Sequence, residues 1–137
     1  MPEPSGSLRS ALIDFLAAFI STNGVGVETG FDIAQRLVES ASFAVDTASG
    51  DLICPSENDI FNAISAEAFP RGEYVTRLIA RRICKSFGQI NSQGGGNLLV
   101  ELNTAGRSVV RERLLPLYGV GEKFVDAYCL LAGIQEL

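Results

Sequence analysis

The chain has 137 residues, of which 47% are hydrophobic and 20% charged, and its formal net charge is −5 at pH 7. This apolar content is enough for the core of one domain and excludes an intrinsically disordered chain. The longest apolar stretch, residues 11–20, is interrupted by Asp14 and preceded by no basic region, so we expect an intracellular protein, cytoplasmic or nuclear, without a membrane span or secretory signal.

The sequence contains no histidine, and its three cysteines, Cys54, Cys84 and Cys129, are far apart. Histidine is the commonest general base and metal ligand, and this cysteine spacing fits neither a disulfide framework nor a zinc or iron–sulfur site. We therefore expect no metal site and no cofactor, interpret the cysteines as buried thiols, and expect any catalysis to depend on Lys, Asp, Glu, Cys or Ser.

Charge is unevenly distributed along the chain. Residues 1–70 contain two basic and ten acidic side chains, a net charge of −8, whereas residues 71–137 contain nine basic and six acidic ones, a net charge of +3. This asymmetry allows one face to meet an anionic partner, although a solvated helix surface explains it equally well.

Three helices are predicted in the first half of the chain. Apolar residues at three- and four-residue spacing place one face of a helix along residues 8–19, with Ser7 as its N-cap. A second helix is expected over residues 28–41. A third begins after Ser56, where an acidic residue three positions later resembles a capping box, and ends at Pro70.

Two segments are expected to be irregular. Residues 46–55 are polar and turn-rich, and residues 88–96 end in three glycines. The glycine loop is interpreted as a mobile connection, because no Lys or Ser/Thr follows it in the phosphate-loop pattern. No alternating strand pattern of useful length is present; residues 42–46 come nearest to one.

The second half continues with a basic amphipathic helix over residues 72–87, in which Arg77, Arg81 and Lys85 share a stripe. Helical spacing then recurs three times, over residues 98–102, 109–114 and 124–132. The sequence therefore predicts a single all-α domain, residues 1–137, built as a compact bundle of six or seven helices without an internal repeat.

The most informative segment lies at residues 114–127. A helix is expected to end near Leu117, and a Gly119-Val120-Gly121 turn leads directly into a second helix. The glycines allow a phosphate to approach the backbone, Val120 anchors the turn in the core, and the N–H groups of the second helix carry partial positive charge. A plain helical hairpin with a glycine C-cap is the alternative interpretation.

The run Leu117-Tyr118-Gly119-Val120-Gly121-Glu122-Lys123 resembles the Leu-Pro-Gly-Val-Gly-x-Lys motif of the helix-hairpin-helix base-excision DNA glycosylases, which include endonuclease III and the 8-oxoguanine glycosylases. Tyr118 replaces the proline. The resemblance places a helix-hairpin-helix at about residues 107–133, and weaker matches extend it over residues 10–134: Phe19 to Asn23, Ala68 to Val75 and Cys129 to Ala132.

The resemblance implies roles for individual residues. Gly119, Val120 and Gly121 would bind the DNA backbone, and Lys123 falls on the lysine that bifunctional members use to attack C1′ of a flipped nucleotide and form a Schiff base. We expect Lys123 to be half-buried at the helix N-terminus, which would lower its pKa. Asp126 is the nearby carboxylate that could orient or deprotonate it. A phosphate-pairing role for Lys123 is the alternative.

The chain also departs from the family pattern. The family has an essential Asp beyond the hairpin, where it stabilises the transition state, and only 14 residues follow Lys123 here. The four-cysteine motif of endonuclease III is absent. The sequence is therefore interpreted as a minimal or truncated glycosylase, or as a relative that binds DNA without catalysis.

Two functions of different class follow from these observations. The first is DNA binding, in which the hairpin holds one strand and Arg77, Arg81 and Arg82 contact phosphates across a cleft, and to which Lys123 could add weak abasic-site lyase chemistry. The second is a non-enzymatic interaction or self-assembly module, in which acidic and basic halves of different copies meet; the isoelectric point of 4.7 favours it.

Overall fold

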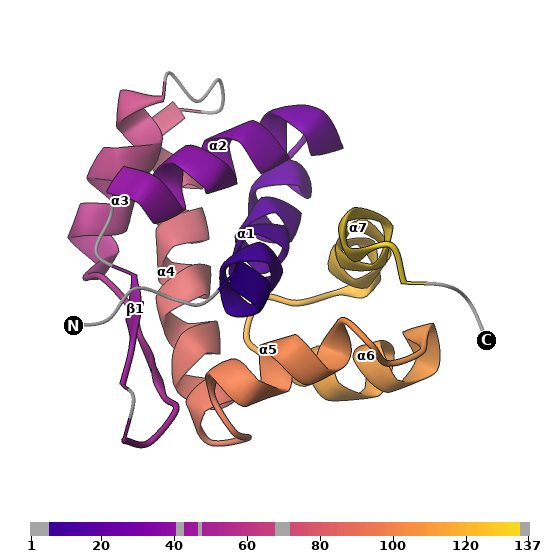
Figure 1. Cartoon of the computed structure of the whole chain (residues 1–137). Coiled ribbons are helices and arrows are strands. Elements are labelled where there is room, and N and C mark those ends of the chain that lie inside the picture. The colour runs from indigo at the N-terminus through magenta and orange to yellow at the C-terminus, as the bar shows by residue number, and fades with distance from the viewer. Residues whose placement is uncertain (1–5, 41–42, 47, 68–71, 135–137) are drawn as a thin grey trace.

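The computed structural model describes residues 6–40, 43–46, 48–67 and 72–134. Within these ranges the chain forms seven helices and one small β-hairpin, which confirms the predicted all-α bundle (Figure 1). No helix in the described ranges is long and apolar enough to cross a membrane. The helices are α1 (Gly6–Ser21), α2 (Val27–Ser40), α3 (Glu57–Ala66), α4 (Gly72–Asn91), α5 (Gly96–Leu102), α6 (Arg107–Leu114) and α7 (Glu122–Ala132).

Helix α1 is the centre of the bundle. All residues from Ala11 to Ile20 are buried, and α1 contacts α2, α4, α5 and α7, which surround it in Figure 1. The spacing of apolar residues predicted one buried face, but the opposite side, including Ile13 and Ala17, is also buried. A helix that is apolar all round is stable only inside a core, so α1 is the element on which the others pack.

An aromatic cluster joins α1 to α4 and α7. The ring of Phe15 lies 5.2 Å from Phe19, 5.8 Å from Phe87 on α4 and 5.2 Å from Phe124 on α7, measured between centroids. These are edge-on or tilted contacts of the kind that aromatic rings prefer. The cluster places α4 and α7 against the same central helix.

Helix starts were predicted with mixed success. The Ser56 hydroxyl accepts a hydrogen bond from the Asp59 N–H at 3.1 Å, which confirms the cap of α3. By contrast, α1 begins at Gly6, so Ser7 lies in its first turn and the predicted N-cap position is wrong. Helix α3 ends at Ala66, and Pro70 lies outside the described residues.

Helix α4 continues to Asn91, four residues beyond the predicted end at Phe87, and the predicted loop 88–96 shrinks accordingly. The extension is stabilised because Ile90 is fully buried, which outweighs the cost of a glycine inside a helix. In the remaining turn, Gly95 has φ +61°, and a Cβ there would lie 2.6 Å from the Gly50 carbonyl oxygen. This glycine therefore serves close packing.

Two short strands that were not predicted lie at and within the turn-rich segment 46–55. Strand β1 (Ala44–Val45) comes just before it, in residues 42–46, where the sequence came nearest to a strand pattern, and β2 (Leu52–Ile53) lies inside it. They pair antiparallel, with Ala44 opposite Ile53 and Val45 opposite Leu52. Strands of two residues are too short to show an alternating pattern. The Asn91 amide joins this hairpin to α4, because it accepts from the Leu52 N–H at 2.8 Å and donates to the Leu52 carbonyl at 2.9 Å.

We expect the buried carboxyl group of Asp14 to make stability depend on pH. Asp14 is 6% exposed, and burial raises its pKa from the usual 3.8 to about 7. The folded state therefore holds this proton more tightly than the unfolded chain, so the contribution of Asp14 to stability is lost as pH rises from about 4 to 7. Over that range, the free energy of unfolding of wild type, measured with urea, should fall by on the order of 3 kcal/mol relative to that of Asp14→Asn. A pH-independent difference would contradict this assignment.

Candidate functional site

Helices α6 and α7 and the turn between them, here called the α6–α7 hairpin, occupy the predicted position. Helix α6 ends at Leu114, three residues before the expected end at Leu117, and Leu117 is buried within the turn. The Val120 N–H donates to the Leu117 carbonyl at 3.2 Å, and Val120 packs half-buried against the core. The turn is therefore anchored as the sequence predicted.

Gly119 brings the turn into contact with α4. Its φ is +76°, a left-handed conformation that favours glycine, and a Cβ at this position would lie 2.6 Å from Cγ and 2.8 Å from Cδ of Arg82. Glycine is thus needed for two reasons, the backbone conformation and the close approach of the Arg82 side chain.

Two further residues of α4 hold the neighbouring Tyr118. The Gln89 side-chain oxygen accepts a hydrogen bond from the Tyr118 N–H, and the Lys85 ammonium lies 4.7 Å from the centroid of the Tyr118 ring. Lys85 and Gln89 were not among the predicted residues of this site. The available signal was their spacing, because Arg82, Lys85 and Gln89 follow one another at three and four residues on one side of α4.

The N-terminus of α7 is open. Gly121 is its N-cap, no side chain caps it, and no atom lies within 4 Å of the position that a Gly121 Cβ would occupy. Gly121, Glu122 and Lys123 are all exposed. The first N–H groups of a helix have no acceptor within the helix, so this end presents donors and partial positive charge to solvent.

The acidic residues of α7 are neutralised by α6. Arg111 donates from Nε to Glu122 at 2.9 Å, and this hydrogen bond holds the pKa of Glu122 below its usual value. Arg107 pairs with Asp126 one turn further along. The hairpin therefore presents less negative charge near the start of α7 than its sequence suggests.

Three cations near the turn are not neutralised in this way. Arg82 lies against Gly119, Lys85 lies over Tyr118, and Lys123 is in the first turn of α7. Among the described residues, none of the three forms an ion pair with a carboxylate. The open helix end and these three cations, here called the hairpin cation site, make up the candidate site.

The predicted catalytic pair is not assembled as expected. Lys123 is exposed, so the expectation of a half-buried lysine is wrong; the buried side of α7 begins with the next residues, Phe124 and Val125. Asp126 pairs with Arg107 rather than with Lys123. The structure thus places Lys123 where it can reach a ligand at the helix end, but without a low-dielectric environment.

The arginines predicted to form one row on α4 contact two different parts of the structure, α3 and the α6–α7 hairpin. The Nε atom of Arg77 lies 3.3 Å from Oε1 of Glu73, and its Cζ lies 4.0 Å from the centroid of the Phe61 ring. The Nε atom of Arg81 lies 3.6 Å from Oε1 of Glu57. Both therefore face α3. Only Arg82 of the three predicted arginines meets the α6–α7 hairpin.

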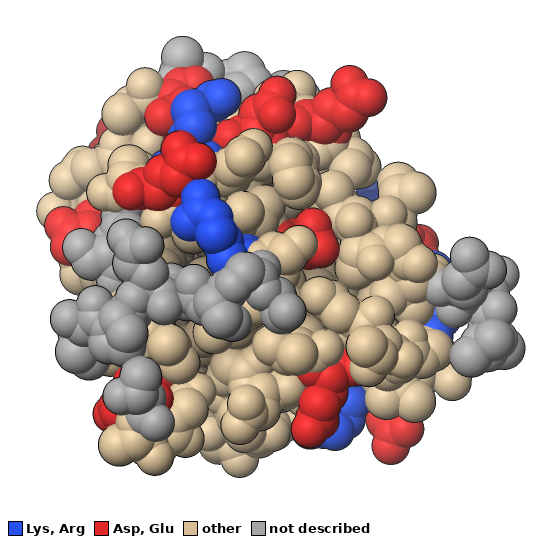
Figure 2. Space-filling model, in the orientation of Figure 1, with Lys and Arg blue, Asp and Glu red and all other residues tan. Residues whose placement is uncertain are grey.

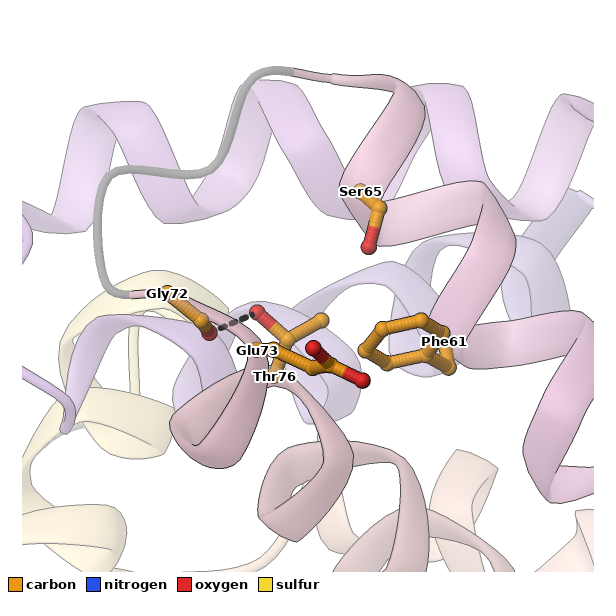
Figure 3. A pocket seen from close by; sticks show the side chains of 5 residues that line it. All are labelled: Phe61, Ser65, Gly72, Glu73 and Thr76. Atoms are coloured by element: carbon orange, nitrogen blue, oxygen red, sulfur yellow. Dashed lines mark hydrogen bonds between the residues drawn. The ribbon is translucent and has the colours of Figure 1, made fainter.

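A pocket of about 430 Å³ lies between α3 and the first turns of α4, away from the α6–α7 hairpin (Figure 3). Its lining includes three polar side chains, those of Ser65, Glu73 and Thr76. The Thr76 hydroxyl donates to the Gly72 carbonyl at 2.7 Å, and Glu73 pairs with Arg77, so two of the three are already engaged. The pocket contains none of the predicted site residues, and Ser65 alone adds no catalytic arrangement.

The surface provides no broader basic region on the face that Figure 2 shows, where most Lys and Arg side chains lie beside Asp or Glu.

In the described ranges no cluster of Cys, Asp and Glu is suited to hold a metal ion. No protein-family model, curated protein or solved structure matches this chain. The hairpin cation site is therefore interpreted from its own geometry.

The contact between Gly119 and Arg82 can be tested through stability. We expect Gly119→Ala to lower the free energy of unfolding by about 1–3 kcal/mol, because alanine is strained at positive φ and its Cβ displaces Arg82. Gly121→Ala is the matched control: it changes the same turn at φ −128° with open space around the new Cβ. It should cost under about 1 kcal/mol, the usual range for an N-cap substitution of this kind.

Urea unfolding of both variants, alone and combined with Arg82→Ala, separates the two causes. Removing Arg82 should restore the part of the Gly119→Ala destabilisation that comes from crowding and leave the part that comes from φ. Equal destabilisation by the two glycine substitutions would show that the turn is not packed against α4.

Proposed function

We propose that this chain is a DNA-binding domain whose α6–α7 hairpin holds backbone phosphates. The observation that carries the proposal is the hairpin cation site. Its uncapped helix N-terminus has open space at Gly121, and Lys123 lies in the first turn of that helix. In the turn before it, Arg82 lies against Gly119 and Lys85 over Tyr118, and none of the three cations has a carboxylate partner among the described residues. Phosphate oxygens accept hydrogen bonds from such N–H groups and are attracted by the surrounding cations. The resemblance of the Gly-Val-Gly-x-Lys turn to the DNA glycosylases supports the same function.

The arrangement of the site favours recognition of the DNA backbone over recognition of bases. A helix N-terminus and flexible cations position a strand through its phosphates, which carry no sequence information. The internal ion pairs of Glu122 and Asp126 support this, because unpaired carboxylates at the same place would repel phosphate. We therefore expect sequence-independent binding that weakens steeply with salt.

Gly121→Val tests the open helix end directly. Its φ of −128° suits a β-branched residue and the space around it is empty, so the variant should fold while its side chain blocks the approach of a phosphate. We expect DNA affinity, measured by fluorescence anisotropy, to fall by about 1–3 kcal/mol.

Gly26→Val is the matched control for this experiment. Gly26 precedes α2 as Gly121 precedes α7, its Cβ position is also open, and the first turn of α2 contains Glu28 instead of a lysine. It should leave DNA affinity unchanged. Equal effects of the two substitutions, or none from Gly121→Val in a folded protein, would exclude the helix end as the phosphate site.

The cations are tested by the salt dependence of binding. Replacing Arg82 and Lys85 together by Gln should reduce the slope of log affinity against log salt by nearly two units, about one for each phosphate that is no longer neutralised. Arg77→Gln with Arg81→Gln removes the same charge from the same helix, but these arginines already pair with Glu73 and Glu57, so a change below about one unit is expected. The opposite ranking would place the DNA against α3.

We propose at most weak chemistry for Lys123. Its amine could attack C1′ of a pre-formed abasic site, where no base has to be expelled, lose water to form a Schiff base and so permit strand cleavage. Intact bases should not be released, because Asp126, the carboxylate predicted to assist Lys123, pairs with Arg107 instead.

Incubation with an abasic duplex and borohydride should trap a small fraction of wild-type chain on DNA, and Lys123→Gln should abolish trapping with DNA binding largely retained. Lys85→Gln is the control for removal of one cation near the turn, and it should still be trapped. Trapping that survives in Lys123→Gln would assign the nucleophile to another amine.

The second candidate function is self-association through the acidic and basic halves of different copies. The specific observation in its favour is the net charge of −8 in residues 1–70 against +3 in residues 71–137. Sedimentation at low and high salt distinguishes the two: assembly that dissociates with salt, in a protein that ignores DNA, would favour this function over DNA binding.

A further inference from the structure

Two of the three cysteines meet in the folded chain, although 30 positions separate them. Cys54 directly follows β2, Cys84 lies in the middle of α4, and their sulfur atoms are 3.8 Å apart. Both side chains are half-buried, whereas Cys129 is buried in α7. Nothing in the sequence spacing indicated this pair.

Neighbouring hydrogen bonds hold the two sulfur atoms in place. The Asn91 amide bonds to both backbone groups of Leu52 and so fastens β2 to α4 on one side of the pair. On the other side, the Cys84 thiol lies 3.5 Å from the Pro55 carbonyl oxygen, to which it donates. The two thiols are therefore held close together by the packing of β2 on α4. Their proximity is not a chance meeting of two flexible surface side chains.

We propose that Cys54 and Cys84 form a redox-modification site, in which a small disulfide such as oxidised glutathione converts the two thiols reversibly into an intramolecular disulfide. A disulfide bond is about 2.05 Å long, so the sulfur atoms, now 3.8 Å apart, need to approach by roughly 1.8 Å to form the bond. This inference is independent of DNA binding.

The exchange proceeds in two steps. The Cys84 thiolate, after losing its proton to water, attacks one sulfur of oxidised glutathione, forms a mixed disulfide and releases one glutathione thiolate, which takes up a proton. The Cys54 thiolate then attacks the Cys84 sulfur and releases the second glutathione. In sum, the protein loses two protons and two electrons, and one oxidised glutathione becomes two reduced molecules.

The order of attack follows from the surroundings of the two thiols. Burial raises the pKa of both, and in Cys84 the hydrogen bond with Cys54 partly offsets this effect, while the charge of Glu57 adds to it. Cys84 is therefore the first nucleophile. Because both pKa values are raised, the reaction is slow at neutral pH and is best measured near pH ~8.5 over hours.

The bond would fasten the segment before α3 to the middle of α4. It closes a loop of about 30 residues, and constraining the unfolded chain in this way raises the midpoint of thermal unfolding by on the order of 10 °C. Dithiothreitol should reverse the shift.

The experiment incubates the full chain with excess oxidised glutathione, followed by intact-mass and peptide analysis under non-reducing conditions. Wild type should decrease in mass by about 2 Da, yield one cross-linked peptide pair containing Cys54 and Cys84, and unfold at the higher temperature. Cys129→Ser should behave in the same way, since Cys129 takes no part.

The single variants show whether the second thiol is the resolving one. In Cys54→Ser the reaction should stop at a stable glutathione adduct on Cys84, and Cys84→Ser should react more slowly. A wild-type chain that keeps both thiols, accumulates a lasting glutathione adduct or links either cysteine to Cys129 would overturn the proposal. So would a disulfide that leaves the thermal midpoint unchanged, because the link would then lie outside the native structure.

Discussion

The burial of α1 is the constraint on which the rest of the structure depends. Ten consecutive residues of this helix are shielded from water, so α2, α4, α5 and α7 have to cover it from different directions. The ring of Phe15 contacts both Phe87 on α4 and Phe124 on α7, so the same core that buries α1 also sets the position of α4 relative to α7. The close approach of Gly119 and Arg82 is a consequence of that placement.

This packing supports the proposed binding of a phosphate at the hairpin more than the proposed chemistry of Lys123. Docking of the turn on α4 places Arg82 against Gly119 and Lys85 over Tyr118, two and three residues before the open helix end at Gly121. Helix α6 pairs with the carboxylates of α7 that would repel an anion. The side of α7 that reaches the core begins at Phe124. Lys123 is left exposed at the surface, outside the apolar packing that begins with the next residue.

Much of the fold could be predicted from local patterns. Spacing of apolar residues located the helices, the Ser56 cap located the start of α3, and the Gly-Val-Gly run located the turn of the α6–α7 hairpin. These signals are encoded within a few neighbouring residues and need no partner elsewhere. The errors occurred where a distant contact decides the outcome: α4 continues past Gly88 because Ile90 is buried, and β2 forms where Asn91 binds Leu52.

By itself the sequence determined the all-α class, the glycine turn and the presence of basic side chains on α4, because these depend on composition and short-range periodicity. Only the tertiary structure decided which cations remain available. Arg77 and Arg81 face carboxylates near α3, whereas Arg82, one position further along the helix, points to the hairpin. Neighbouring positions on a helix are about 100° apart, so the partner of each side chain is set by the packing of whole helices, which no local pattern encodes.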